Sequence, residues 1–283
     1  MGIGNFERDT RPNSTASDHR YAVNLSPDWA VWGPNGGYVA AITLRAMCKS
    51  AALPRPAAFH CQFLKAGRFD AAEVVVERVR AGKRSEALRA KLVQDGEELV
   101  SASLWLTEDG MPGLEHEAAE APDVRKPAHL KSFAEIFDNY ADWYPYWRSV
   151  EARPSLPDLP TGPPIWQTWM RLNDPPAQFD QALAAARIVL WMDLGPWNAA
   201  AAPHPWPRRY LGPNLDLHVQ FHRFAETDEW LLVDAAAPVA RDGVIGTTLR
   251  LWSEGGELVA SGGSMLFCRR NPNYEEELKR AQS

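Results

Sequence analysis

The sequence lacks the features that mark several large classes of protein. Its 283 residues contain only three cysteines, Cys48, Cys61 and Cys268, and none of them forms a C-x-x-C pair. An odd number of widely spaced cysteines predicts reduced thiols buried as small apolar side chains, and neither a disulfide nor a metal site. No apolar run reaches the roughly 18 residues that a membrane-spanning helix needs. The nearest candidate is interrupted by Arg187 and Asp193.

Positive charge and targeting signals are also scarce. Thirty Lys and Arg residues stand against 36 Asp and Glu, which gives a net charge of −6. An acidic chain without a basic face does not attract a phosphate backbone, so we expect no nucleic-acid partner. The N-terminus lacks the cationic and apolar blocks of a signal peptide, and Phe6 stands where a myristoylation signal needs Ser or Thr. We therefore expect a cytoplasmic protein.

Common cofactor and catalytic motifs are missing as well. The sequence contains no G-x-G-x-x-G after a strand pattern, no P-loop, no H-E-x-x-H and no paired Cys/His spacing. "GGSML" around Ser264 lacks the closing glycine of G-x-S-x-G and lies within a strand pattern, which argues against a serine hydrolase. We expect no metal and no bound cofactor.

What the sequence does contain is an internal repeat. "GEELVSASLWL" at 96–106 resembles "GELVASGGSML" at 256–266, and "FHCQF" at 59–63 resembles "LHVQF" at 217–221. The two matches have almost the same offset, which indicates a duplication. With 45% apolar residues the chain can bury a substantial core, as one large domain or two of about 140 residues.

Each copy shows the same order of elements. A helix with apolar residues around most of its circumference is predicted at 38–53 and again at 179–198. Period-two alternation predicts strands of an antiparallel sheet after each helix. These strands are expected near 59–63, 74–76, 88–92 and 99–106 in the first copy, and 215–221, 229–236, 243–252 and 257–269 in the second. The pattern predicts an α+β protein in which a long helix is wrapped by a curved sheet, twice.

The connection between the copies, residues 109–164, is rich in Pro, Glu and Asp but includes the aromatic cluster "FAEIFDNYADWYPYW". We expect this cluster to pack on a sheet, either as ordinary core or as the lining of an acyl-chain pocket. The expected organisation is a polar N-terminal segment (1–20), a first domain (21–108), the linker (109–164), a second domain (165–270) and a C-terminal tail (271–283).

Several phrases resemble the acyl-CoA thioesterase II family, whose fold is a tandem, or double, hotdog. They are "GPNGGYVAA", "WMDLGPW", "NLDLHVQFHR", "DEWLL" and "GELVASGGSML", and the resemblance extends from about Tyr21 to Arg270. It implies hydrolysis of an acyl-CoA to a carboxylic acid and CoA, with CoA present only as part of the substrate. It also implies one site, on the second hotdog.

In that family three side chains hold the hydrolytic water. The resemblance assigns the family's aspartate to Asp193, its threonine to Asn214 and its glutamine to Ser264, so only one of the three is conserved in type. Asp193 can accept the water's proton, and Asn214 keeps a donor and an acceptor. Ser264 loses the amide donor, which costs on the order of 3 kcal/mol of transition-state stabilisation if nothing replaces it. A slow thioesterase, a rearranged site and a non-catalytic acyl-CoA binding protein all remain open.

Other residues are candidates for substrate binding. Gly36 and Gly37 at the start of the first helix offer N–H groups that can polarise a thioester carbonyl, or simply allow close helix packing. His218 and His60 hold equivalent positions in the two copies, either as solvent-facing side chains or as site residues. A pairing of Asp193 with His218 would instead suit hydratase-type hotdog chemistry.

Two further expectations concern the surroundings of Asp193 and the assembly. Asp193 faces the seam between two separate sheets, unless it merely pairs with an arginine such as Arg187 or Arg208. Exposed sheet edges favour a homodimer or a higher homo-oligomer.

Overall fold

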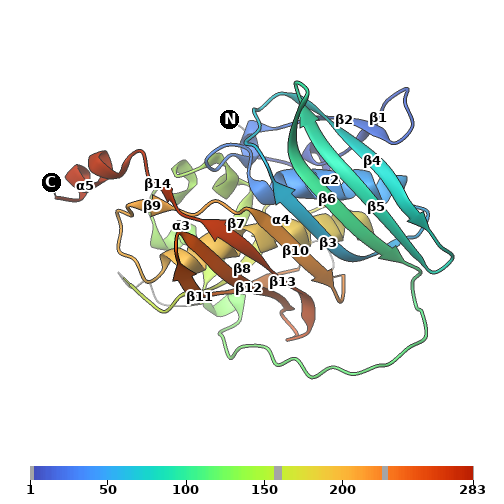
Figure 1. Ribbon diagram of the computed structural model, residues 1–283. Helices are drawn as coiled ribbons and strands as arrows, with labels where there is room; N and C mark the ends of the chain where they lie inside the picture. Colours follow the sequence, from blue (N-terminus) through green and yellow to red (C-terminus); the bar gives the residue numbers. More distant parts are fainter. Residues whose placement is uncertain (1–2, 156–160, 225–228, 283) are drawn as a thin grey trace.

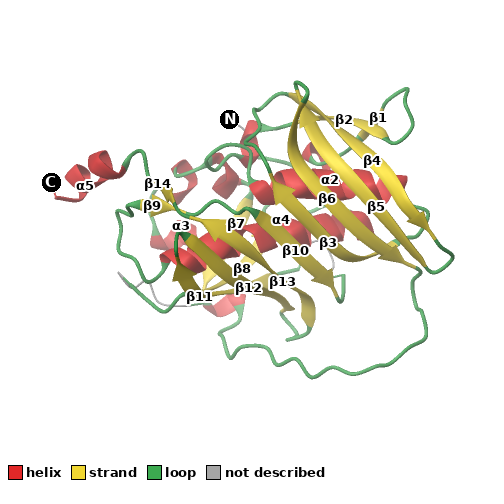
Figure 2. Ribbon diagram, viewed as in Figure 1, coloured by secondary structure: helices red, strands yellow, loops and turns green. Residues whose placement is uncertain are grey.

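The computed structural model describes residues 3–155, 161–224 and 229–282. The remaining residues, which belong to the predicted N-terminal segment, linker, second domain and tail, lie outside that description. A 12-stranded antiparallel sheet curves around two long helices, α2 (Gly36–Ser50) and α4 (Gln181–Ala201) (Figure 1). Figure 2 shows the two helices on one face of the sheet. No helix among the described residues is long and apolar enough to cross a membrane.

The strands confirm the predicted repeat. The first half contributes β1 (Asn13–Ser14), β2 (Arg20–Asn24), β3 (Arg55–Phe63), β4 (Ala71–Ala81), β5 (Ser85–Gln94) and β6 (Glu97–Thr107). The second contributes β7 (Val150–Pro154), β8 (Ile165–Leu172), β10 (Asp216–Phe221), β11 (Leu231–Arg241), β12 (Val244–Ser253) and β13 (Leu258–Phe267). A separate two-stranded sheet joins β9 (Tyr210–Leu211) to β14 (Arg269–Arg270). Short helices are α1 (Phe6–Asp9), α3 (Phe133–Ile136) and α5 (Tyr274–Gln282), with 3-10 turns at Pro27–Trp29, Pro127–His129, Tyr140–Asp142 and Pro145–Arg148.

The order of the strands shows the tandem hotdog directly. It runs β1-β2-β4-β5-β6-β3-β10-β13-β12-β11-β8-β7, so the second half repeats the first in reverse about the β3–β10 junction. At that junction His60 lies opposite His218, which confirms that the two histidines are equivalent. The expectation of two separate sheets was wrong. β3 and β10 would otherwise be exposed edges, and their antiparallel pairing satisfies the backbone groups of both.

Both helices are fixed by capping and burial. The Asn35 side chain accepts a hydrogen bond from the Tyr38 N–H (3.0 Å), and Asp180 accepts one from the Leu183 N–H (2.9 Å). Side chains on nearly all sides of α4 are buried because the sheet covers one side and α2 the other. The predicted central helices are therefore confirmed.

Two segments pack more tightly than their composition suggested. The expected polar N-terminus contains α1, whose Phe6 is 1% exposed and lies against Trp29 with ring centroids 5.5 Å apart. The expected linker contains β7, which extends the second half of the sheet. Within its aromatic cluster Tyr146 and Trp147 are buried in the core, whereas Trp143 is 43% exposed. Both segments are held in place by apolar contacts with residues that are distant in the sequence.

Candidate active site

Asp193 lies where α4 meets the N-terminus of α2. Only 7% of the residue is exposed. Its Oδ1 accepts a hydrogen bond from Asn214 Nδ2 at 2.7 Å, and its Oδ2 accepts one from Asn35 Nδ2 at 3.1 Å. The Gly37 N–H donates to the same carboxylate. Three donors from two hotdog halves therefore converge on one buried acid.

Two glycines let the helices approach this closely. A Cβ on Gly36 would lie 2.7 Å from Asp193 Oδ1, and one on Gly37 would lie 2.7 Å from the Leu190 carbonyl oxygen. Contacts that short are not tolerated, so both positions need glycine for the carboxylate to reach α2. Close helix packing is thus observed at both. The Gly37 N–H points to Asp193, while the predicted contact of either N–H with a substrate carbonyl stays a prediction.

Burial and hydrogen bonding act on Asp193 in opposite directions. Burial raises the pKa of Asp193 above its ordinary value, while the hydrogen bonds from Asn214, Gly37 and Asn35 favour the ionised form and limit the rise. The positive end of the α2 dipole also favours a negative charge here. No Lys or Arg within the described ranges forms an ion pair with Asp193, so simple pairing with Arg187 or Arg208 is not observed.

Asn214, to which the resemblance assigned the family's threonine, lies beside Asp193. It precedes β10 and forms an isolated bridge with Leu266 of β13. Its Nδ2 also donates to the Asp193 carbonyl oxygen at 2.9 Å, which fixes the side chain on α4. Its Oδ1 is buried and has no hydrogen-bond partner among the described residues. The amide thus keeps a spare acceptor beside the carboxylate.

Ser264 is buried nearby but is engaged elsewhere. It stands two residues before Leu266 on β13, yet its Oγ donates to the Asp216 carbonyl oxygen at 2.7 Å. Its own N–H donates to Thr247 Oγ1 at 3.1 Å. The structure brings Asp193 and Asn214 together but gives Ser264 no hydrogen bond to either.

His218 lies on the other face of the sheet. Along β10, Leu217 and Val219 are buried towards the helices, whereas His218 is exposed. The pairing of Asp193 with His218 is therefore absent, because successive strand side chains point to opposite faces and Asp193 lies on the helix side. A solvent-facing position is observed for His218.

Sequence reasoning missed two residues. Asn35 was not assigned to the site, although a cap amide can accept with one atom and donate with the other. Tyr146, on the turn Pro145–Arg148, was grouped with the other aromatic residues; burial and then the charge of Asp193 raise its pKa. The asparagine before two glycines was a usable signal for the first, whereas nothing in the sequence distinguished the second.

An aromatic group begins one helical turn from Asp193. Trp197 is four residues after Asp193 on α4, and its ring lies 6.1 Å from that of Trp32 in the loop before α2. The Trp32 indole N–H donates to the Tyr144 hydroxyl at 3.1 Å. Trp32 is 48% exposed, so this group joins the solvent to the region of Asp193.

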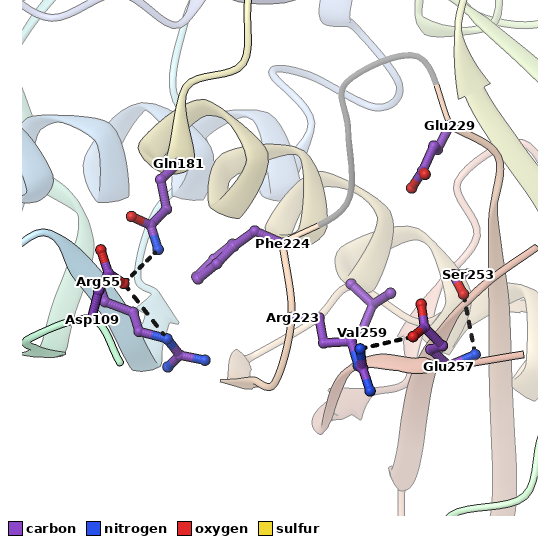
Figure 3. A pocket seen from close by; sticks show the side chains of 9 residues that line it. All are labelled: Arg55, Asp109, Gln181, Arg223, Phe224, Glu229, Ser253, Glu257 and Val259. Atoms are coloured by element: carbon purple, nitrogen blue, oxygen red, sulfur yellow. Dashed lines mark hydrogen bonds and ion pairs between the residues drawn. The ribbon is translucent and has the colours of Figure 1, made fainter. Parts of the chain in front are cut away.

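A surface hollow of about 430 Å³ lies elsewhere (Figure 3). Its lining includes Gln181, the first residue of α4, which is about 18 Å along the helix from Asp193. Arg55 there faces Asp109 at 4.0 Å, and Arg223 pairs with Glu257 at 2.7 Å. With Glu229 also in the lining, acidic side chains outnumber the arginines, so this hollow is unsuited to an anion.

Comparison with known proteins identifies the family. The model of the acyl-CoA thioesterase N-terminal domain matches residues 25–107, and that of the acyl-CoA thioesterase C-terminal domain matches residues 114–263. The chain belongs to the acyl-CoA thioesterase family. This thioesterase thus carries both domains of the family in one chain, in agreement with the internal repeat.

Solved structures share the fold. The acyl-CoA thioesterase II TesB2 from Mycobacterium marinum has 24% identity and a TM-score of 0.78, covering 95% of this thioesterase and 100% of that chain. A hot dog fold protein of unknown function from Alicyclobacillus acidocaldarius has 20% identity and a TM-score of 0.77, covering 94% and 98%. The dehydratase domain from the CurJ module of curacin polyketide synthase, at 12% identity and a TM-score of 0.55, covers 93% and 98%. A similar fold therefore also occurs in a protein that is named as a dehydratase domain.

Proposed function

We propose that this thioesterase hydrolyses acyl-CoA to a carboxylic acid and CoA by means of a water molecule held and deprotonated by Asp193. The observation that carries the proposal is the Asp193 carboxylate, buried and held by Asn35, Asn214 and Gly37. A carboxylate whose pKa is raised is a better proton acceptor than an exposed one. Fixed donors hold it in one position, which general base catalysis requires.

The reaction balances without a further reagent. The water gives one proton to Asp193 and bonds the other to Asn214 Oδ1, while its oxygen attacks the thioester carbonyl carbon. The tetrahedral intermediate then expels the CoA thiolate, which takes the proton from Asp193. No metal or bound cofactor enters this scheme, and the aromatic group of Trp32, Tyr144 and Trp197 lines the approach of the substrate.

We further propose that turnover is slow. Ser264 has a short side chain whose hydroxyl is bonded to the Asp216 carbonyl, so it supplies no amide donor to the reacting group. Loss of one well-aimed donor lowers the rate by roughly 100- to 1,000-fold. A homo-oligomer in the cytoplasm acting on acyl-CoA remains our expectation for the assembly and its setting.

A thiol-trapping assay over a panel of acyl-CoAs tests the proposal. Wild type should release CoA thiol, and Asp193→Asn should lower kcat by about 100- to 10,000-fold because the base is removed. Asp180→Asn is the control, since it makes the same change of charge on the same helix, at the N-cap of α4. Tight acyl-CoA binding by the wild type without thiol release would overturn hydrolysis and support a binding protein.

A further inference from the structure

Tyr146 is held firmly beside the loop that leads to α2. The residue is 0% exposed. Its ring contacts Trp29 edge-on with centroids 5.9 Å apart, and its backbone N–H donates to the Ala30 carbonyl oxygen at 3.2 Å. The Trp29 carbonyl in turn accepts the Asn35 N–H at 3.0 Å. A short chain of contacts therefore connects Tyr146 to the residue that holds Asp193.

The hydroxyl of Tyr146 is anomalous. It is buried and has no hydrogen-bond partner in the described part of the chain, although buried hydroxyl groups are nearly always paired. The charge of Asp193 acts on it and, together with burial, keeps the phenol protonated. The side chain is thus a neutral donor near the carboxylate.

Asn214 Oδ1 is a second buried atom without a hydrogen-bond partner among the described residues, and it is an acceptor. Its amide nitrogen is fixed on Asp193, so the free oxygen is held in place too. A bound water has two protons and two lone pairs. Asp193 and Asn214 can accept both protons, but neither can donate to the water oxygen. One donor is missing from the set, and Ser264 does not supply it.

We propose that the Tyr146 hydroxyl is that donor: it bonds the oxygen of the water held by Asp193 and Asn214, and leaves the second lone pair free to attack the thioester. Tyr146 acts through the water and is therefore a positioning residue. The inference rests on the proposed function. It also explains how a site with Ser264 keeps its water in one orientation.

Tyr146→Phe separates this role from a structural one. The variant keeps the ring and its contact with Trp29, and removes a hydroxyl that bonds no described group. We expect kcat to fall by about 10- to 100-fold, with KM within about twofold, because only the held water is affected. The melting temperature should be unchanged or higher, since no protein hydrogen bond is lost.

Tyr140→Phe is the matched control from the same segment. The Tyr140 hydroxyl donates to the Trp147 carbonyl oxygen at 3.1 Å, so its loss should lower the melting temperature and leave kcat unchanged. The two variants are thus expected to show opposite patterns.

The outcomes distinguish the inference from the function beneath it. If wild type releases thiol and Tyr146→Phe has the same kcat, the positioning role is refuted and hydrolysis stands. A fall in kcat accompanied by a drop in melting temperature would assign Tyr146 a structural role instead. If wild type releases no thiol from any acyl-CoA in the panel, the proposed function itself fails.

Discussion

At one end of the helix pair, the N-terminus of α2 meets Asp193 of α4; at the other, the N-terminus of α4 lies near Cys48 of α2. Each helix starts with a side-chain cap, Asn35 in the first case and Asp180 in the second. Asp180 is exposed, and its charge acts on Cys48 and Arg45. Asn35 is 8% exposed and holds Asp193.

The difference lies in what a cap can do besides capping. An amide accepts from the helix with its oxygen and donates to a neighbour with its nitrogen, whereas a carboxylate only accepts. Asn35 can therefore cap its helix and also donate to a carboxylate, whereas Asp180 can only cap its helix. Burial and the charge of Asp180 raise the pKa of Cys48 to about 12, so its thiol is protonated at neutral pH. Duplication gave two similar ends, and they differ in that the cap of the first end bonds a buried carboxylate, Asp193.

Asn35→Asp gives α2 the kind of carboxylate cap that α4 has. Of the changes at the two ends, it should have the largest effect. The cap bond to Tyr38 is kept, but the donor to Asp193 is lost and a like charge replaces it. We expect kcat to fall by about 100-fold, because the pKa of Asp193 rises further and its position is no longer fixed. Steady-state kinetics with the best acyl-CoA measures this.

The reverse change at the other end is its control. Asp180→Asn keeps the cap on α4. It should leave kcat within about twofold, since no carboxylate there depends on a hydrogen bond from residue 180. Equal losses in the two variants would show that the Asn35 amide has no special part in activity.

The pH dependence sharpens the comparison further. Asp193 must be ionised to accept a proton, so kcat/KM should fall about tenfold per pH unit below its raised pKa. The midpoint should lie above 3.8, the ordinary value for this group. A midpoint at or below 3.8 would show that a different group controls the rate.

The free energy of unfolding should also depend on pH, in a direction that the raised pKa of Asp193 determines. Because the folded state binds the Asp193 proton more tightly than the unfolded chain, the stability from this group is greatest below pH 3.8 and is lost as the pH rises through the folded pKa. Asp193→Asn cannot titrate. Its free energy of unfolding relative to wild type, from urea denaturation, should therefore increase over that window and then level off.

Close helix approach at the Asp193 end predicts a smaller, structural effect. Gly37→Ala should lower the free energy of unfolding by about 2 kcal/mol, because its Cβ would meet the Leu190 carbonyl oxygen at 2.7 Å and backbone atoms cannot move aside easily. Gly33→Ala, whose Cβ would meet no atom within 4 Å, should change it little. Urea denaturation of both variants measures the difference.

The sequence predicted most of the fold because its signals are periodic. The repeat around His60 and His218 identified the strands that now pair, and apolar patterning located both helices. β2, β7 and β8 were missed, since they lie outside the repeated phrases. The joining of the two sheets was missed because strand patterning does not say which edges pair.

The site was only half predictable for a similar reason. Asp193 and Asn214 were found by resemblance, and their hydrogen bond is now seen. Ser264 could be aligned, but the bond of its hydroxyl to the Asp216 carbonyl depends on the register of neighbouring strands. Asn35 of the first half bonds Asp193, and the charge of Asp193 acts on Tyr146 of the linker. Such interactions between distant segments have no sequence period.

Cys48→Ala should have the smallest effect and tests whether the second end is inert. A protonated, partly buried thiol is neither a nucleophile nor a base at neutral pH, so kcat should stay within about twofold of wild type. Stability should fall by no more than about 1 kcal/mol, the usual cost of a small cavity. A large loss of kcat with an unchanged melting temperature would instead show that the thiol takes part in turnover. Both ends of the helix pair would then take part in turnover. The difference between an amide cap and a carboxylate cap would not explain why the proposed site lies at one end.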